Sequence, residues 1–196
     1  MRKLTLFMLG IAMPFLFSCS SNSKTEEQGN TTAKDSMPSY TSDTSLKDPV
    51  DTAGNANVTF VLKAAAGGMM EVELGHMAQQ SALNPRVKQF GAMMVKDHSK
   101  ANEELKALAD TKNILIPSKM PDKLQQHIDE MKKLGGKEFD KHYMSMMTDD
   151  HKEDIDLFEK TAEGIKDPDL KAFATKTLPV LKMHLDSAKK IKSDLK

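Results

Sequence analysis

One short phrase occurs twice in the chain, at residues 93–98 and 146–151, and both copies read Met-Met-x-x-Asp-His. A neutral imidazole is a common ligand for transition metals, and a neighbouring carboxylate can either join it as a ligand or fix its tautomer. Each copy lies in a long stretch whose apolar residues recur at helical spacing. His98 and His151 fall on the apolar faces of these stretches, so they are the first candidates for chemistry.

Helices must position these histidines, and the start signals for two of them are clear. Asn84-Pro85 and Asp167-Pro168 each place a capping side chain before a proline at the first helical position. Periodicity predicts helices at about 58–83, 85–111, 122–134, 137–163 and 168–195. Four long amphipathic helices and one short helix predict an all-α fold, an up-down four-helix bundle with an additional short helix.

The inner faces of the four long helices each carry one residue that can bind a metal. These residues are Glu73, His98, His151 and His184. If the helices pack in register, the four side chains converge, and Asp97, Asp150 and Tyr143 can surround them as hydrogen-bond partners. Two interpretations stay open: a metal site, or a structural layer in which the polar groups satisfy one another.

Several longer patterns make the chain from about Phe60 onward resemble the family named domain of unknown function 4142, whose members are often described as predicted outer-membrane proteins. The patterns are Glu73-x-Gly75, Phe90 with Met94-Val95-x-Asp97-His98, Phe139-Asp140-x-x-Tyr143 with Asp150-His151, and Leu178-Pro179-x-Leu181-x-x-His184. The resemblance implies a ferritin-like four-helix bundle in the cell envelope. It implies no established activity.

The residues limit which metal chemistry is open. Ferritin-like di-iron sites use Glu-x-x-His on two helices, whereas Val95 and Thr148 stand three residues before His98 and His151. This argues against a ferroxidase. Three imidazoles and one carboxylate suit Fe, Zn, Mn or Cu. Methionines near the histidines could hold Cu(I), or could simply fill gaps in the core.

The N-terminus indicates export and lipidation. Residues 1–18 have a basic start and a short apolar run, which is typical of a signal peptide. The sole cysteine, Cys19, follows Leu16-Phe17-Ser18 and resembles the lipidated residue of bacterial lipoproteins. Residues 19–56 are polar and predict a flexible linker to the bundle at 57–196. We therefore expect a lipid anchor in the envelope, on the outer membrane, facing the periplasm or the surface.

Composition excludes other classes of function. The 28 basic and 28 acidic residues balance, so no basic surface predicts nucleic-acid binding. Phosphate-binding loops and nucleophile elbows are absent from the sequence, and no catalytic residue is predicted. Two hypotheses follow: a non-enzymatic module that binds protein partners in the envelope, or a metal-binding protein for metal handling or oxidative-stress protection.

Overall fold

A computed structural model of the chain describes residues 52–195. This part contains five helices and no strands. They are α1 (Thr52–Ser81), α2 (Pro85–Thr111), α3 (Asp122–Met131), α4 (Gly136–Gly164) and α5 (Pro168–Asp194). None of these helices combines the length and hydropathy needed to span a membrane. The predicted signal peptide, Cys19 and most of the predicted linker lie outside the described residues.

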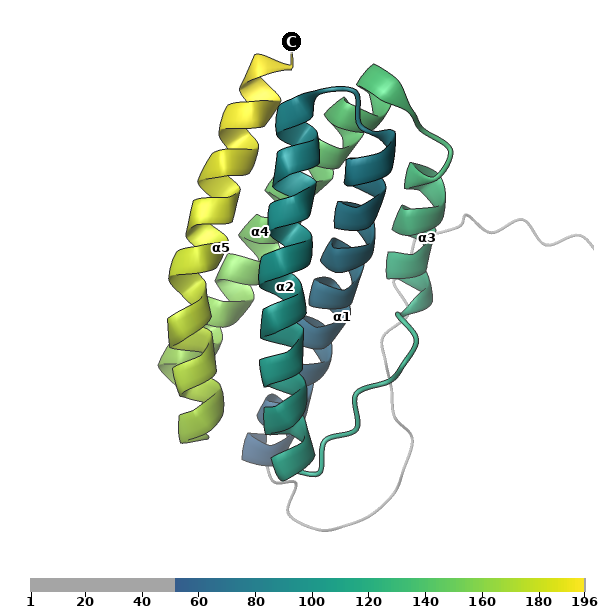
Figure 1. The fold of residues 1–196 in the computed structure, drawn as a ribbon. Coiled ribbons are helices and arrows are strands. Elements are labelled where there is room, and N and C mark those ends of the chain that lie inside the picture. Colours follow the sequence, from purple (N-terminus) through teal and green to yellow (C-terminus); the bar gives the residue numbers. More distant parts are fainter. Residues whose placement is uncertain (1–51, 196) are drawn as a thin grey trace, which may run out of the picture. The chain divides into compact units, whose positions relative to one another are not determined.

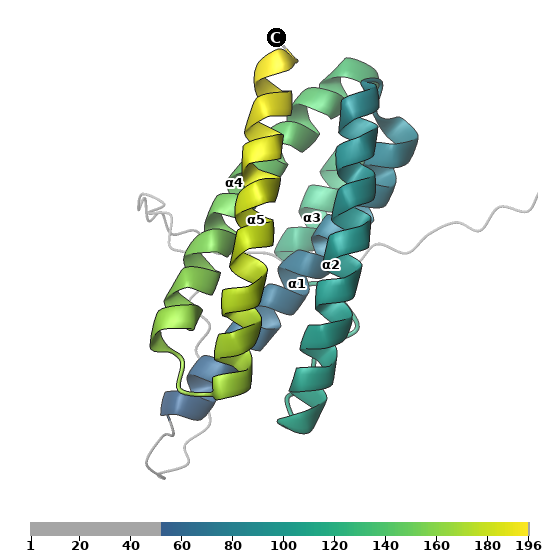
Figure 2. The same cartoon turned by 60° about the vertical axis from the view of Figure 1, so that its left-hand side comes forward.

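The four long helices form a bundle in which α1 packs against α2, α2 against α5, α5 against α4 and α4 against α1. Figures 1 and 2 show that α2 and α4 run in the same direction, because the connection at 112–135 travels back along the bundle and carries α3. One long crossover of this kind is the connectivity of ferritin-like bundles. The predicted all-α fold with four long helices and one short helix is therefore confirmed.

The helix boundaries differ from the predictions mainly at α1, which begins at Thr52, six residues before Val58. Residues 52–57 are small or polar, so hydrophobic periodicity gives no signal there. At the other end, the Asp140 carboxylate accepts hydrogen bonds from the backbone N–H groups of Leu83 (3.0 Å) and Asn84 (2.8 Å). A buried side chain of α4 thus holds the turn between α1 and α2.

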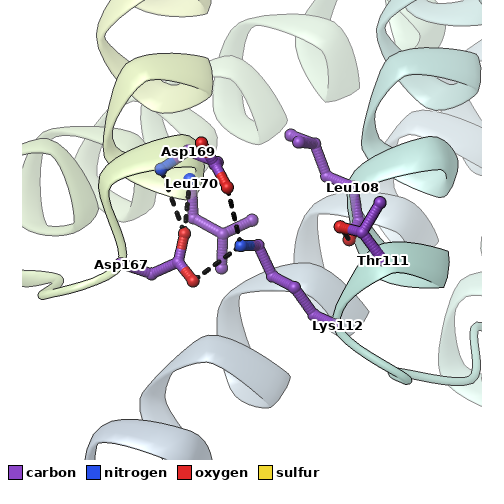
Figure 3. Close-up of polar contacts among 6 residues, drawn as sticks. All are labelled: Leu108, Thr111, Lys112, Asp167, Asp169 and Leu170. Atoms are coloured by element: carbon purple, nitrogen blue, oxygen red, sulfur yellow. Dashed lines mark hydrogen bonds and ion pairs between the residues drawn. The ribbon is translucent and has the colours of Figure 1, made fainter.

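The predicted cap of α5 also ties two helices together (Figure 3). Asp167 Oδ1 accepts from the backbone N–H groups of Asp169 and Leu170, both at 3.0 Å. Lys112, just after α2, lies 2.7 Å from Asp167 Oδ2 and 3.0 Å from Asp169 Oδ2. The Lys112 cation lies at the C-terminal end of α2, where the helix dipole is negative. The Asp167 and Asp169 carboxylates lie at the N-terminal end of α5, where the dipole is positive, so both placements are stabilising.

The core consists of two apolar clusters with a polar layer between them along each helix. The Met-rich cluster contains Met70, Leu74, Phe90, Met94, Phe139, Tyr143, Met144 and Met147 among others. The Phe-rich cluster contains Phe60, Leu105, Phe158, Leu170, Phe173 and Leu181 among others. The polar layer consists of Glu71, His98, His151 and His184, which are all buried.

Candidate metal centre

The polar layer receives one buried side chain from each long helix. Glu71 comes from α1, His98 from α2, His151 from α4 and His184 from α5, and none of them is more than 6% exposed. The structure therefore brings together the three histidines that the sequence singled out. Burial of four polar side chains at one level is costly unless each finds partners or a ligand.

The spacing of the three imidazoles fits a single ion. One ring nitrogen from each histidine lies within 4.8 Å of those of the other two. The ring centres are separated by 5.3 Å (His98–His184), 5.3 Å (His151–His184) and 5.6 Å (His98–His151). With metal–nitrogen bonds of about 2.05 Å, ring centres lie about 5.2 Å apart in a tetrahedral site and about 5.5 Å apart in a trigonal one. The ring centres already have this spacing, and in such a site the nitrogens lie about 3.3–3.6 Å apart.

Each histidine has one ring nitrogen next to an oxygen acceptor, which sets its tautomer. The distances are 2.7 Å from His98 Nδ1 to Glu71 Oε2, 2.9 Å from His151 Nδ1 to the Met147 carbonyl oxygen, and 3.0 Å from His184 Nε2 to Asp97 Oδ2. In a neutral ring these nitrogens carry the proton and donate it. The lone pair is then on the other nitrogen.

Those other nitrogens have no hydrogen-bond partner among the described residues. They are His98 Nε2, His151 Nε2 and His184 Nδ1. Leaving a buried polar atom unpaired costs about 1–3 kcal/mol. Three such atoms in one layer form a donor set for a metal, with the opposite nitrogens hydrogen-bonded as metal-binding histidines usually are.

Burial also keeps the imidazoles neutral. It lowers the pKa of His98, His151 and His184 to about 4 in each case, and the nearby carboxylates only partly oppose this. Protons therefore compete weakly for these nitrogens above pH 5. The same burial raises the pKa of Glu71 to about 7 and that of Asp150 to about 8. A bound cation would offset the charge of these carboxylates.

The carboxylate predicted from α1 was the wrong one. Glu73 is 40% exposed and its carboxylate lies 3.7 Å from Lys132 Nζ, away from the histidines. Glu71 takes its place, because α1 presents residues 64, 68, 71, 75 and 78 to the bundle at alternating spacings of four and three. Four of these five are Ala or Gly. That stripe of small residues was the available signal.

The other predicted residues differ in their roles. Asp97 bonds to His184, as predicted for a partner that fixes a tautomer. Tyr143 is fully buried, its ring stacks on Phe139 with ring centres 5.6 Å apart, and its hydroxyl has no partner among residues 52–195. Asp150 is partly buried, and its Oδ2 has no partner in the same part of the chain.

Asp154, which the sequence pattern did not single out, lines the same small cavity as Glu71, and burial raises the pKa of Asp154 well above its usual range. It lies three residues after His151 and so on the same side of α4.

Residues 44–191 match the family described as a domain of unknown function, DUF4142. The chain belongs to this family. No curated protein matches this DUF4142 protein significantly in sequence.

Solved structures share the fold of the DUF4142 domain. A DUF305 protein from Streptomyces coelicolor matches with a TM-score of 0.63 and 12% identity, over 73% of this chain and 95% of that one. Silver-bound CopM matches with a TM-score of 0.59 and 14% identity, over 70% and 96%. Copper(I)-bound CopM matches with a TM-score of 0.60 and 12% identity, over 70% and 96%. At these identities the likeness establishes the fold alone.

Proposed function

We propose that this DUF4142 domain binds a transition metal through His98, His151 and His184 and takes part in metal handling in the bacterial envelope. The observation that carries the proposal is the set of three buried, neutral imidazoles, each with its unprotonated nitrogen left without a partner. A purely structural polar layer would be expected to pair these atoms with one another or with neighbours. Glu71 and Asp97 hold the rings in the tautomers that a metal needs.

Copper is the first metal to test, with zinc as the comparison. Imidazole ligands suit both ions. The fold is shared with CopM, whose solved structures carry silver and copper, and this supports copper as the choice. Three protein ligands without a cysteine leave room for a fourth, exchangeable ligand, which is typical of sites that transfer or react rather than only stabilise a fold.

The N-terminal features support a place for this activity. A signal peptide at 1–18 and lipidation at Cys19 would anchor the domain to the membrane, and residues 19–56 would act as the tether. Outer-membrane anchoring would put the metal site in the periplasm or at the surface. The proposal includes no catalytic residue and no enzymatic reaction.

Elemental analysis of the protein, extracted in detergent and purified without a histidine tag or chelator, tests the proposal. We expect about one equivalent of copper or zinc per chain and a higher melting temperature when metal is added to the metal-free protein. His151→Ala should abolish both effects. His142→Ala is the matched control, because His142 lies on the same helix and is exposed.

If no metal binds, or if His151→Ala binds metal as well as the unchanged protein does, the proposal is wrong. The histidines would then form a structural polar layer, and the search would turn to protein partners.

A further inference from the structure

In α1, Gly68 makes room for an oxygen atom from another helix, and its neighbour Gly67 lies beside a second one. A Cβ atom added at Gly68 would lie 2.1 Å from Asn102 Oδ1, which is impossible without movement. A Cβ atom added at Gly67 would lie 3.5 Å from Asp154 Oδ1. Each glycine inside a helix costs about 1 kcal/mol relative to alanine. At Gly68 that cost lets Asn102 from α2 approach α1 one turn before Glu71, whereas Asp154 from α4 lies at an ordinary contact distance from position 67.

Asn102 and Asp154 both line a small cavity beside His98, whose wall has a polar part and a larger apolar part. The cavity has a volume of about 20 Å³, and its polar lining is Glu71, His98, Asn102, Asp154 and Thr177. Such a volume holds one water molecule or one ion. His98 and Thr177 also line a groove of about 220 Å³ between α2 and α5. The groove and the cavity therefore lie next to each other.

The two carboxylates at this cavity, Glu71 and Asp154, form no ion pair with a lysine or arginine within residues 52–195. The basic side chains next to Glu71 are His98 and His151, which burial keeps neutral. Glu71 is 1% exposed, and its Oε1 atom has no hydrogen bond within residues 52–195. His151 Nδ1 lies 3.3 Å from it, but that N–H is directed at the Met147 carbonyl oxygen, 2.9 Å away. A buried carboxylate needs positive charge or a proton donor.

We propose that the cavity is a second metal site, which holds a hard divalent cation through the side-chain oxygens of Glu71, Asn102 and Asp154. Oxygen-only ligands select Mg²⁺, Ca²⁺ or Mn²⁺, whereas the neighbouring imidazoles select softer transition metals. Glu71 connects the two sites, because its other oxygen accepts from His98. This site does not depend on metal binding by the three histidines.

Mn²⁺ is a suitable probe, because its free form gives a paramagnetic resonance signal that is lost on binding. The full chain, extracted in detergent, is titrated with Mn²⁺ before and after loading with zinc. We expect one equivalent to bind tightly in at least one of these states. Asp154→Asn and Asn102→Ala should each weaken binding by at least tenfold. Asp156→Asn, which changes an exposed carboxylate two residues further along α4, should leave binding unchanged.

His184→Ala separates this proposal from the previous one. We expect it to retain Mn²⁺ binding, because His184 does not line the small cavity. Circular dichroism confirms that each variant is folded. The second site is disproved if Mn²⁺ does not bind in either state, if Asp154→Asn binds it normally, or if His184→Ala abolishes binding. Zinc or copper binding without Mn²⁺ binding would leave the histidine site intact and remove only this one.

Discussion

The polar layer and the apolar clusters are built on the same four helices but obey different rules. In the Met-rich and Phe-rich clusters, large apolar side chains are buried against one another and gain free energy by leaving water. In the polar layer, Glu71 and the three histidines are equally buried, yet four of their polar atoms have no hydrogen-bond partner in the part of the chain that the structure describes. The difference indicates that the clusters hold the bundle together, and that the polar layer lowers stability and is suited to binding.

A change in the Met-rich cluster should give the largest loss of stability without touching metal binding. Phe139 is fully buried and lies twelve residues before His151 on α4, a distance of about 18 Å along the helix. Phe139→Ala should lower the free energy of unfolding by about 3–5 kcal/mol, measured by urea denaturation of the metal-free protein. The zinc affinity of the folded variant should stay within about threefold of that of the unchanged protein. A large fall in affinity would mean that the two regions are not independent.

A change at the close contact between α1 and α2 should give the second-largest loss of stability. A Cβ atom added at Gly91 would lie 2.7 Å from both the Gly75 carbonyl oxygen and the Ala78 Cβ. Because neither can move freely, Gly91→Ala should cost about 1–3 kcal/mol of stability through overpacking. Gly164→Ala is the control, since nothing lies within 4 Å of a Cβ atom there. Equal melting temperatures for the two variants would contradict the predicted close contact.

Local signals were enough to predict most of the fold. Asn84-Pro85 and Asp167-Pro168 start α2 and α5 where the sequence indicated, because capping depends on a few adjacent residues. His98, His151 and His184 could also be predicted as inner residues. The helices that carry them have a polar outer face, which identifies the opposite face as the buried one. The start of α1 at Thr52 was missed, because no apolar residue marks that turn.

The rest of the site depends on contacts between helices that periodicity does not encode. Buried residues occur on several sides of α1, including the consecutive Ala64, Ala65 and Ala66, so its inner face could not be chosen and Glu73 was taken in place of Glu71. The position of Asn102 depends on the missing side chain of Gly68, which is thirty-four positions earlier in the chain. Only the packed structure shows that pairing.

Within the polar layer, a partner of a histidine should have a smaller effect than a histidine itself. Asp97 is 28% exposed and accepts from His184 Nε2 at 3.0 Å. Asp97→Asn keeps the shape but removes the charge that favours this tautomer, so metal affinity should fall about 10–100-fold. Competition with a chromophoric chelator measures it, and Asp149→Asn, on the exposed side of α4, serves as control. An unchanged affinity would show that Asp97 does not orient His184.

The pH dependence of the metal-free protein provides the most subtle test of the polar layer. The folded-state pKa of each buried histidine, about 4, is below the unfolded value, so its contribution to stability is complete above about pH 6.5 and is lost as pH falls toward 4. The folded-state pKa of Glu71, about 7, and that of Asp150, about 8, are raised, so their contributions are present at low pH and are lost as pH rises. Between about pH 4.5 and 6.5, rising pH increases the stability contribution of the histidines and decreases that of the two carboxyl groups, so the two effects oppose each other.

Above pH 6.5 the histidines no longer contribute to the slope, and the carboxyl groups alone determine it. Asp150 should then lower the free energy of unfolding by about 1 kcal/mol between pH 6.5 and 8, measured from urea midpoints in chelator. Asp150→Asn should remove this part of the loss, whereas Asp149→Asn should not, because the hydrogen bond from Lys152 holds the pKa of Asp149 below its usual range. An equal slope in Asp150→Asn would mean that Asp150 is already ionised in the folded protein. The polar layer would then carry its negative charge without a proton, and its need for a bound cation would be greater.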